Sequence, residues 1–114
     1  MTGVIWCNRI AQGNNMLIKI VSEYGRMGIL PIKYINGTKT AHSVRFENGD
    51  YWRVCSATSS SRGTACNVSY VARDISYDVF RSIILPCTKS MPYRAIQLYG
   101  EGNLHITDKS PLPF

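Results

Sequence analysis

The sequence predicts an α/β fold: a small mixed sheet with a β-hairpin meander and two packed helices. Strand-like apolar runs alternate with helical patterns at both ends of the chain, which is typical of an α/β sheet. Two Asn-Gly turn signals separate extended segments in the middle, which adds antiparallel strands. With 114 residues, 45% of them hydrophobic, and no internal repeat or low-complexity linker, we expect residues 1–114 to form a single domain.

The first elements are a strand and a helix. Val4–Cys7 is a short apolar run without helical spacing, which is typical of a buried strand. A helix is expected over Asn15–Tyr24, capped by Asn14 or Asn15, because apolar residues recur there at helical spacing. Gly25 would end this helix in the left-handed conformation.

A meander of three strands should follow. Its first strand is expected over Ile29–Ile35, where Pro31 favours a sheet edge or an irregular start. The second and third strands, His42–Glu47 and Tyr51–Ala57, flank an Asn48–Gly49 turn in which both residues would have positive φ.

A two-residue turn at Asn48–Gly49 also predicts which side chains share a face. Phe46 would lie opposite Tyr51, and Val44 opposite Arg53, on one side of the hairpin. Arg45 would lie opposite Trp52 on the other side. Because each face would then carry large apolar groups, we expect both faces to be partly covered.

The second half of the chain should hold a strand, a helix and a further strand. Val68–Val71 is the expected strand. Ser76 can cap the helix, whose first turn carries Asp78, and Pro86 would stop it. Arg94–Tyr99 has the composition of a last strand.

Composition limits the classes of site. Four distant cysteines without a C-x-x-C pair predict buried free thiols and no metal site (Cys7, Cys55, Cys66, Cys87). No run of about 18 apolar residues predicts a membrane helix, and the N-terminus lacks the pattern of a secretory signal. We therefore expect a cytoplasmic location and no membrane partner.

Charge suggests a polyanionic partner. The net charge is +6, although the thirteen Lys and Arg residues are spread along the chain without a basic run. Arg45, Arg53 and Arg62 are the candidate nucleic-acid contacts, because they lie on or beside a hairpin that also offers Tyr51 and Trp52 for stacking. The alternatives are ordinary sheet packing with outward arginines and, for Arg62, an ion pair that fixes its loop.

The order of motifs between residues 46 and 71 carries a family resemblance. Phe46, Asn48 and Gly49 form F-x-N-G, a serine-rich polar loop ends in Arg62–Gly63, and the apolar strand Asn67–Val71 follows. This order resembles the ATPase core of phage terminase large subunits, the motors that package DNA into viral heads. The resemblance implies part of a RecA-like ATPase core, with Asn67–Val71 as the Walker B strand.

The departures from that family concern its chemistry. No G-x-x-x-x-G-K-[ST] stretch is present, so the chain lacks a P-loop. Counted from Gly63, the Mg²⁺-binding Asp of the family falls on Ala72 and its catalytic Glu on Arg73, while Asp74 comes too late. The resemblance therefore implies a pseudo-ATPase that is not an enzyme and uses no cofactor.

These observations favour a non-catalytic, phage-encoded binding protein that acts through protein or nucleic acid in the host cytoplasm. One alternative is an inhibitor or decoy aimed at a host nuclease or defence system. Another is part of a split ATPase that borrows a P-loop from a partner. We expect pairing with another chain or with itself, because a missing P-loop strand would leave Val68–Val71 with an unpaired edge or a bare face. Nucleic-acid binding would be weak and non-specific.

Overall fold

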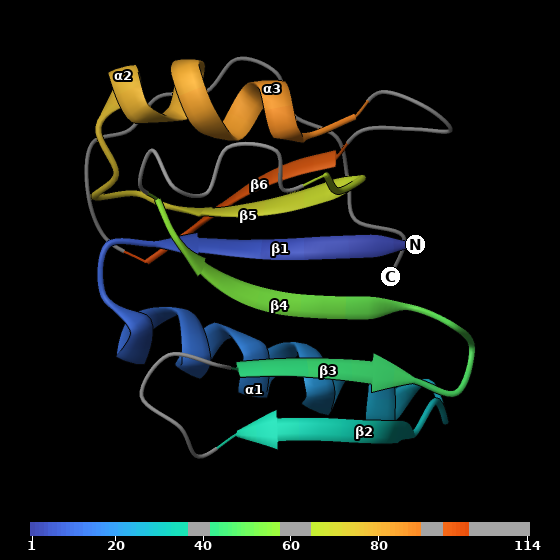
Figure 1. Cartoon of the computed structure of the whole chain (residues 1–114). Coiled ribbons are helices and arrows are strands. Elements are labelled where there is room, and N and C mark those ends of the chain that lie inside the picture. Colours follow the sequence, from blue (N-terminus) through green and yellow to red (C-terminus); the bar gives the residue numbers. More distant parts are fainter. Residues whose placement is uncertain (37–41, 58–64, 90–94, 101–114) are drawn as a thin grey trace.

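The computed structural model of the chain describes residues 1–36, 42–57, 65–89 and 95–100 (Figure 1). Within them, six strands form one sheet in the order β2-β3-β4-β1-β5-β6. The strands are β1 (Thr2–Cys7), β2 (Pro31–Asn36), β3 (His42–Phe46), β4 (Tyr51–Ser56), β5 (Val68–Ala72) and β6 (Ala95–Tyr99). β4, β1, β5 and β6 run parallel, whereas β3 is antiparallel to both β2 and β4. The predicted mixed α/β class is confirmed.

Two helical layers lie against opposite faces of this sheet (Figure 1). α1 (Ile10–Arg26) packs on β3, β4 and β1 with the cluster that contains Ile5 and Cys7 of β1. The second layer is continuous: α2 (Tyr77–Val79), η2 (Phe80–Ile84) and α3 (Leu85–Cys87). It packs on the cluster that contains Val4 and Trp6, the alternate residues of β1, so the two layers flank the sheet.

The placement of β5 corrects an expectation. β5 pairs with β1 on one side and with β6 on the other, and all five of its residues are buried. Val68–Val71 therefore has neither an unpaired edge nor a bare face. In the described sheet the outer strands are β2 and β6. The position of β2 at one edge agrees with Pro31, beside which the register shifts.

α1 begins five residues before its expected start. Its N-cap is Arg9, which makes no side-chain capping bond, and neither Asn14 nor Asn15 serves as the cap. Gly13 lies inside the helix, because there the backbone approaches the sheet too closely for a larger residue. The helix ends at Arg26, and Gly28 rather than Gly25 adopts the left-handed conformation beyond it. The Gly28 N–H bonds to the Gly25 carbonyl and the Ile29 N–H to the Tyr24 carbonyl, and Gly28 has a φ of 77°.

The β3–β4 hairpin has a three-residue loop. The Phe46 N–H donates to the Asp50 carbonyl at 2.8 Å, and of the loop residues only Gly49 has positive φ. The expected two-residue turn and its register are therefore wrong by one position. Val44 pairs with Trp52, Arg45 with Tyr51 and Ser43 with Arg53. One extra loop residue exchanges the faces of the whole strand.

The second helical layer begins as expected and ends later. The Ser76 hydroxyl accepts a hydrogen bond from the Val79 N–H at 3.2 Å, which confirms the predicted cap. Pro86 does not stop the helix. The chain widens into a π-helical turn over Phe80–Ile84, and the Leu85 N–H bonds to the Phe80 carbonyl, five residues back. This wider turn ends at Ile84, two residues before Pro86, and the helix continues to Cys87.

The remaining expectations concern the cysteines, a membrane-spanning helix and the loop around Arg62. All four cysteines are free, and all are buried except Cys55, which is half-buried. None of the helices among the described residues is long and apolar enough to cross a membrane. Arg62, Gly63 and the polar loop around them lie outside the described residues.

Candidate nucleic-acid interface

The meander presents a face that no described helix covers, because α1 packs on its other side. Two rows of paired residues form it. Lys33, Arg45 and Tyr51 make one row across β2, β3 and β4, and Ile35, Ser43 and Arg53 make the next. We call these six residues the open face. On the other side of the same strands, Val44, Phe46 and Trp52 are fully buried against α1.

The open face is basic. Lys33 and Arg45 are exposed and Arg53 is half-buried, and no Asp or Glu occurs within β2, β3 or β4. The ion pairs among the described residues join Met1 to Asp50 and Arg26 to Glu23, so they involve none of these three cations. Positive charge on this face is therefore not offset by a carboxylate of its own strands.

An aromatic ring lies under one of these charges. The Arg45 guanidinium sits over the Tyr51 ring, 4.9 Å from its centroid. Lys33, Ile35, Ser43, Arg45 and Tyr51 line a shallow hollow of about 170 Å³. An exposed guanidinium on a ring, next to a lysine and a serine, offers hydrogen-bond donors to phosphate and a flat surface to a base.

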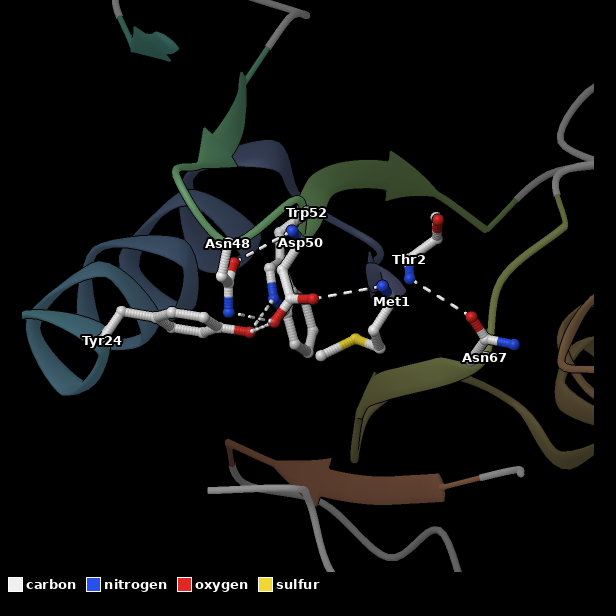
Figure 2. A network of polar contacts seen from close by, with 7 residues as sticks. All are labelled: Met1, Thr2, Tyr24, Asn48, Asp50, Trp52 and Asn67. Atoms are coloured by element: carbon white, nitrogen blue, oxygen red, sulfur yellow. Dashed lines mark hydrogen bonds and ion pairs between the residues drawn. The ribbon is translucent and has the colours of Figure 1, made fainter. Parts of the chain in front are cut away.

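A polar cluster behind the hairpin fixes its turn (Figure 2). Asp50 accepts hydrogen bonds from the Tyr24 hydroxyl at 2.7 Å, the Asn48 amide at 3.2 Å and the Met1 amino group at 3.1 Å. The Tyr24 hydroxyl in turn accepts from the Trp52 indole N–H at 3.0 Å. Because these bonds join α1, β1 and β4, they hold the register that places Arg45 and Arg53 together.

The structure thus brings two of the three predicted contacts, Arg45 and Arg53, to one face. The predicted hairpin register had put them on opposite faces, and that part was wrong. The third, Arg62, lies outside the described residues. Lys33 was missed in the sequence, because only the pairing of Lys33 with Arg45 shows that it shares their face.

Ala72 and Arg73 lie at the carboxyl end of β5. Ala72 is fully buried, and Arg73 follows the strand with its N–H bonded to the Tyr99 carbonyl at 2.9 Å. β1 and β5 lead from here to helices on opposite faces, an arrangement at which α/β sheets often bind ligands. The Asn8 amide spans this point by donating to the Asp74 carbonyl at 2.9 Å.

The buried thiols are poor nucleophiles. Desolvation by burial raises the pKa of Cys7 from 9.0 to about 11, and burial likewise raises the pKa of Cys55 and Cys66. Within the described residues no three His, Cys, Asp or Glu side chains gather in a way that could hold a metal ion.

Comparison of the chain with protein-family models, with curated proteins and with solved structures found no match.

Proposed function

We propose that this chain is a non-catalytic binding protein that contacts the phosphate backbone of nucleic acid through the open face. The observation that carries the proposal is the gathering of Lys33, Arg45 and Arg53 on one uncovered side of the meander, without a carboxylate on its strands. Contacts of this kind bind phosphates independently of sequence, and their strength depends steeply on salt.

The non-catalytic part of the proposal rests on residue chemistry at the end of β5. The Ala72 side chain has no oxygen with which to bind Mg²⁺, and Arg73 cannot act as a general base toward water. The sequence also lacks a P-loop lysine and its glycine loop. Phosphoryl transfer needs a positioned metal and nucleophile, and Ala72 and Arg73 supply neither a metal ligand nor a base at these positions.

A role beside a DNA-packaging motor extends the proposal. It draws on the order of F-x-N-G, Arg62–Gly63 and the β5 strand, which resembles the terminase ATPase core. Under this hypothesis the chain is a phage-encoded pseudo-ATPase that binds nucleic acid or a partner of the motor without hydrolysing nucleotide.

Fluorescence anisotropy with short single- and double-stranded DNA at two salt concentrations tests the binding. We expect dissociation constants on the order of 10⁻⁴ to 10⁻⁶ M near physiological salt, the usual range of non-specific binding. Lys33→Ala and Arg45→Gln should each weaken binding equally for all sequences and reduce the salt slope by about one.

Lys19→Ala is the matched control, because it removes the same charge from an exposed position on α1, on the other side of the sheet. It should leave DNA binding within about twofold of the parent, since few surface charges act beyond a Debye length. Absence of binding at low salt, or an equal loss in Lys19→Ala and Lys33→Ala, would refute a defined interface.

A protein partner is a second candidate, favoured by the edge strand β2. Leu30 and Ile32 are 60% and 65% exposed, and in the described sheet β2 pairs only with β3. Edge strands with exposed apolar side chains invite pairing with another chain. Light scattering at micromolar concentration tests self-pairing. A parent chain that is already monomeric, with the same mass as the Ile32→Lys variant, would count against it.

A further inference from the structure

A second hollow lies on the opposite side of the sheet from the open face, between α1 and the end of β6. Its volume is about 420 Å³, within the usual range of small-molecule sites. Gln12, Met16 and Lys19 line it from α1, Arg9 from the N-cap of that helix, and Tyr99 and Gly100 from the end of β6. Residues three and four positions apart lie on one side of a helix, so Gln12, Met16 and Lys19 share one side of α1 and, with Arg9 at its N-cap, form one wall.

The charge of this wall is positive. Arg9 and Lys19 are both exposed, and among the described residues neither takes part in an ion pair and no carboxylate lines the hollow. The first turn of α1 also contains no acidic residue, so no side chain there opposes the positive end of the helix. A dianion would find two cations on one wall.

Gln12 adds an unmatched polar atom. Its Oε1 is buried and has no hydrogen-bond partner among the described residues, although Gln12 lines the hollow. A Cβ built on Gly100 would lie 3.1 Å from the Nε2 of Gln12. The amide therefore packs against the end of β6. A buried amide oxygen without a donor is costly, and a ligand hydroxyl would supply that donor.

From these contacts we propose that the hollow binds a small phosphate monoester that also carries hydroxyl groups, such as a sugar phosphate. A phosphate monoester has a charge near −2 at neutral pH, which matches the two cations better than a single carboxylate does. The Arg9 guanidinium can bind two phosphate oxygens at once, and Lys19 a third. A sugar hydroxyl donates to Gln12 Oε1, while Tyr99 and Met16 offer apolar surface to the carbon skeleton.

This site does not depend on the proposed function, because its residues and those of the open face are different. It uses no residue of β2, β3 or β4. A chain that fails to bind DNA could still bind the sugar phosphate, and a chain that fails to bind the sugar phosphate could still bind DNA.

Isothermal titration calorimetry with ribose 5-phosphate, inorganic phosphate and ribose tests the site. Ribose 5-phosphate should bind best, in the micromolar to millimolar range, with ribose alone showing no heat of binding. Lys19→Ala and Arg9→Gln should each weaken binding by about tenfold, as expected for loss of a hydrogen bond to a charged group. Gln12→Leu should abolish the preference for ribose 5-phosphate over inorganic phosphate.

Lys33→Ala is the matched control, since it removes an equal charge from the open face. It should leave ribose 5-phosphate affinity unchanged while weakening DNA binding, and Lys19→Ala should do the opposite. Circular dichroism tests whether each variant is folded. We expect Lys19→Ala and Lys33→Ala to fold, because both lysines are exposed. No binding at millimolar ribose 5-phosphate, or equal losses in Lys19→Ala and Lys33→Ala, would overturn the proposal.

Discussion

At the scale of single residues, two glycines of α1 differ in how closely they pack. A Cβ on Gly13 would lie 2.5 Å from Val54 Cγ1 and 2.9 Å from Cys7 Sγ, both of which belong to the sheet under α1. Gly25, in the last turn of the same helix, has no described atom outside its own helix backbone and chain neighbours within 4 Å of its Cβ position. The two glycines therefore differ in packing although both are helical.

Gly13→Ala and Gly25→Ala should consequently have opposite effects on the free energy of unfolding. Alanine normally stabilises a helix relative to glycine by roughly 0.5–1 kcal/mol, and Gly25→Ala should gain about this amount. Gly13→Ala should lose about 1–3 kcal/mol, because overpacking forces the helix off the sheet. Urea unfolding of both variants measures this.

The double variant Gly13→Ala/Val54→Ala separates overpacking from other causes. Removing the Val54 methyl groups makes room for the new Cβ, so the cost of Gly13→Ala should shrink in that background. An unchanged cost would contradict the close contact as its cause.

Sequence reasoning named the candidate arginines one by one but did not place Arg45 and Arg53 on one surface. Arg45 and Arg53 were recognised from charge and turn context. Arg45 and Arg53 share a face because the loop contains Glu47 as a third residue. The Asn48–Gly49 signal predicts a two-residue turn without Glu47. The bonds of Asp50 to Tyr24 and Met1 join residues far apart in the chain, so no local pattern contains this information.

At the scale of elements, local capping signals set some ends and tertiary contacts set others. Ser76 caps the second helical layer as its sequence context predicts. α1 instead starts at Ile10 without a side-chain cap, and its polar residues Asn14 and Asn15 misplaced the expected start. Burial of Leu17, Ile20 and Tyr24 against the sheet outweighs the weak propensity of the first turn.

Ser76→Ala should destabilise the protein by about 1 kcal/mol, because it removes the acceptor of the Val79 N–H. Ser82→Ala is the matched control in the same layer. The Ser82 hydroxyl donates to the Asp78 carbonyl at 2.7 Å, an exposed bond within the helix that adds little stability. Thermal unfolding should show a clear loss for Ser76→Ala only; equal losses would mean that the cap does not stabilise this helix.

At the scale of the whole molecule, the chain buries many groups that ionise only at high pH. Burial raises the pKa of Tyr70 from 10.0 to about 12 and that of Cys7 from 9.0 to about 11, and it also raises the pKa of Tyr99. In each case the folded state favours the protonated form. The unfolded chain loses these protons first as the pH rises.

The contribution of Cys7 to the free energy of unfolding should therefore be constant below pH 9.0 and be lost from there through about 11, as Cys7 ionises in the unfolded chain but not in the folded one. Each such group contributes a slope of up to about 1.4 kcal/mol per pH unit. Urea unfolding at a series of alkaline pH values measures the slope. Cys7→Ala should make it shallower, whatever the variant's stability at neutral pH; an identical slope would exclude Cys7 as a source.

The α/β class and nearly every strand could be predicted, because hydrophobic periodicity and turn residues are local. The strand order could not. β1 pairs with β4, from which α1, β2 and β3 separate it in the chain, and with β5, which follows β4. The sequence contains no signal for that choice. The expected bare edge of Val68–Val71 failed for this reason, since β1 and β6 occupy both sides of β5.

The central position of β1 has a consequence for synthesis on the ribosome. Among the described strands β1 leaves the ribosome first, yet its neighbours β4 and β5 emerge only about 50 and 65 residues later, as the bonds Met1–Asp50 and Thr2–Asn67 show. At 5–20 residues per second, its apolar Val4–Cys7 segment is exposed for on the order of several seconds. Chaperone binding to nascent chains should therefore centre on this segment and cease once residue 72 has emerged.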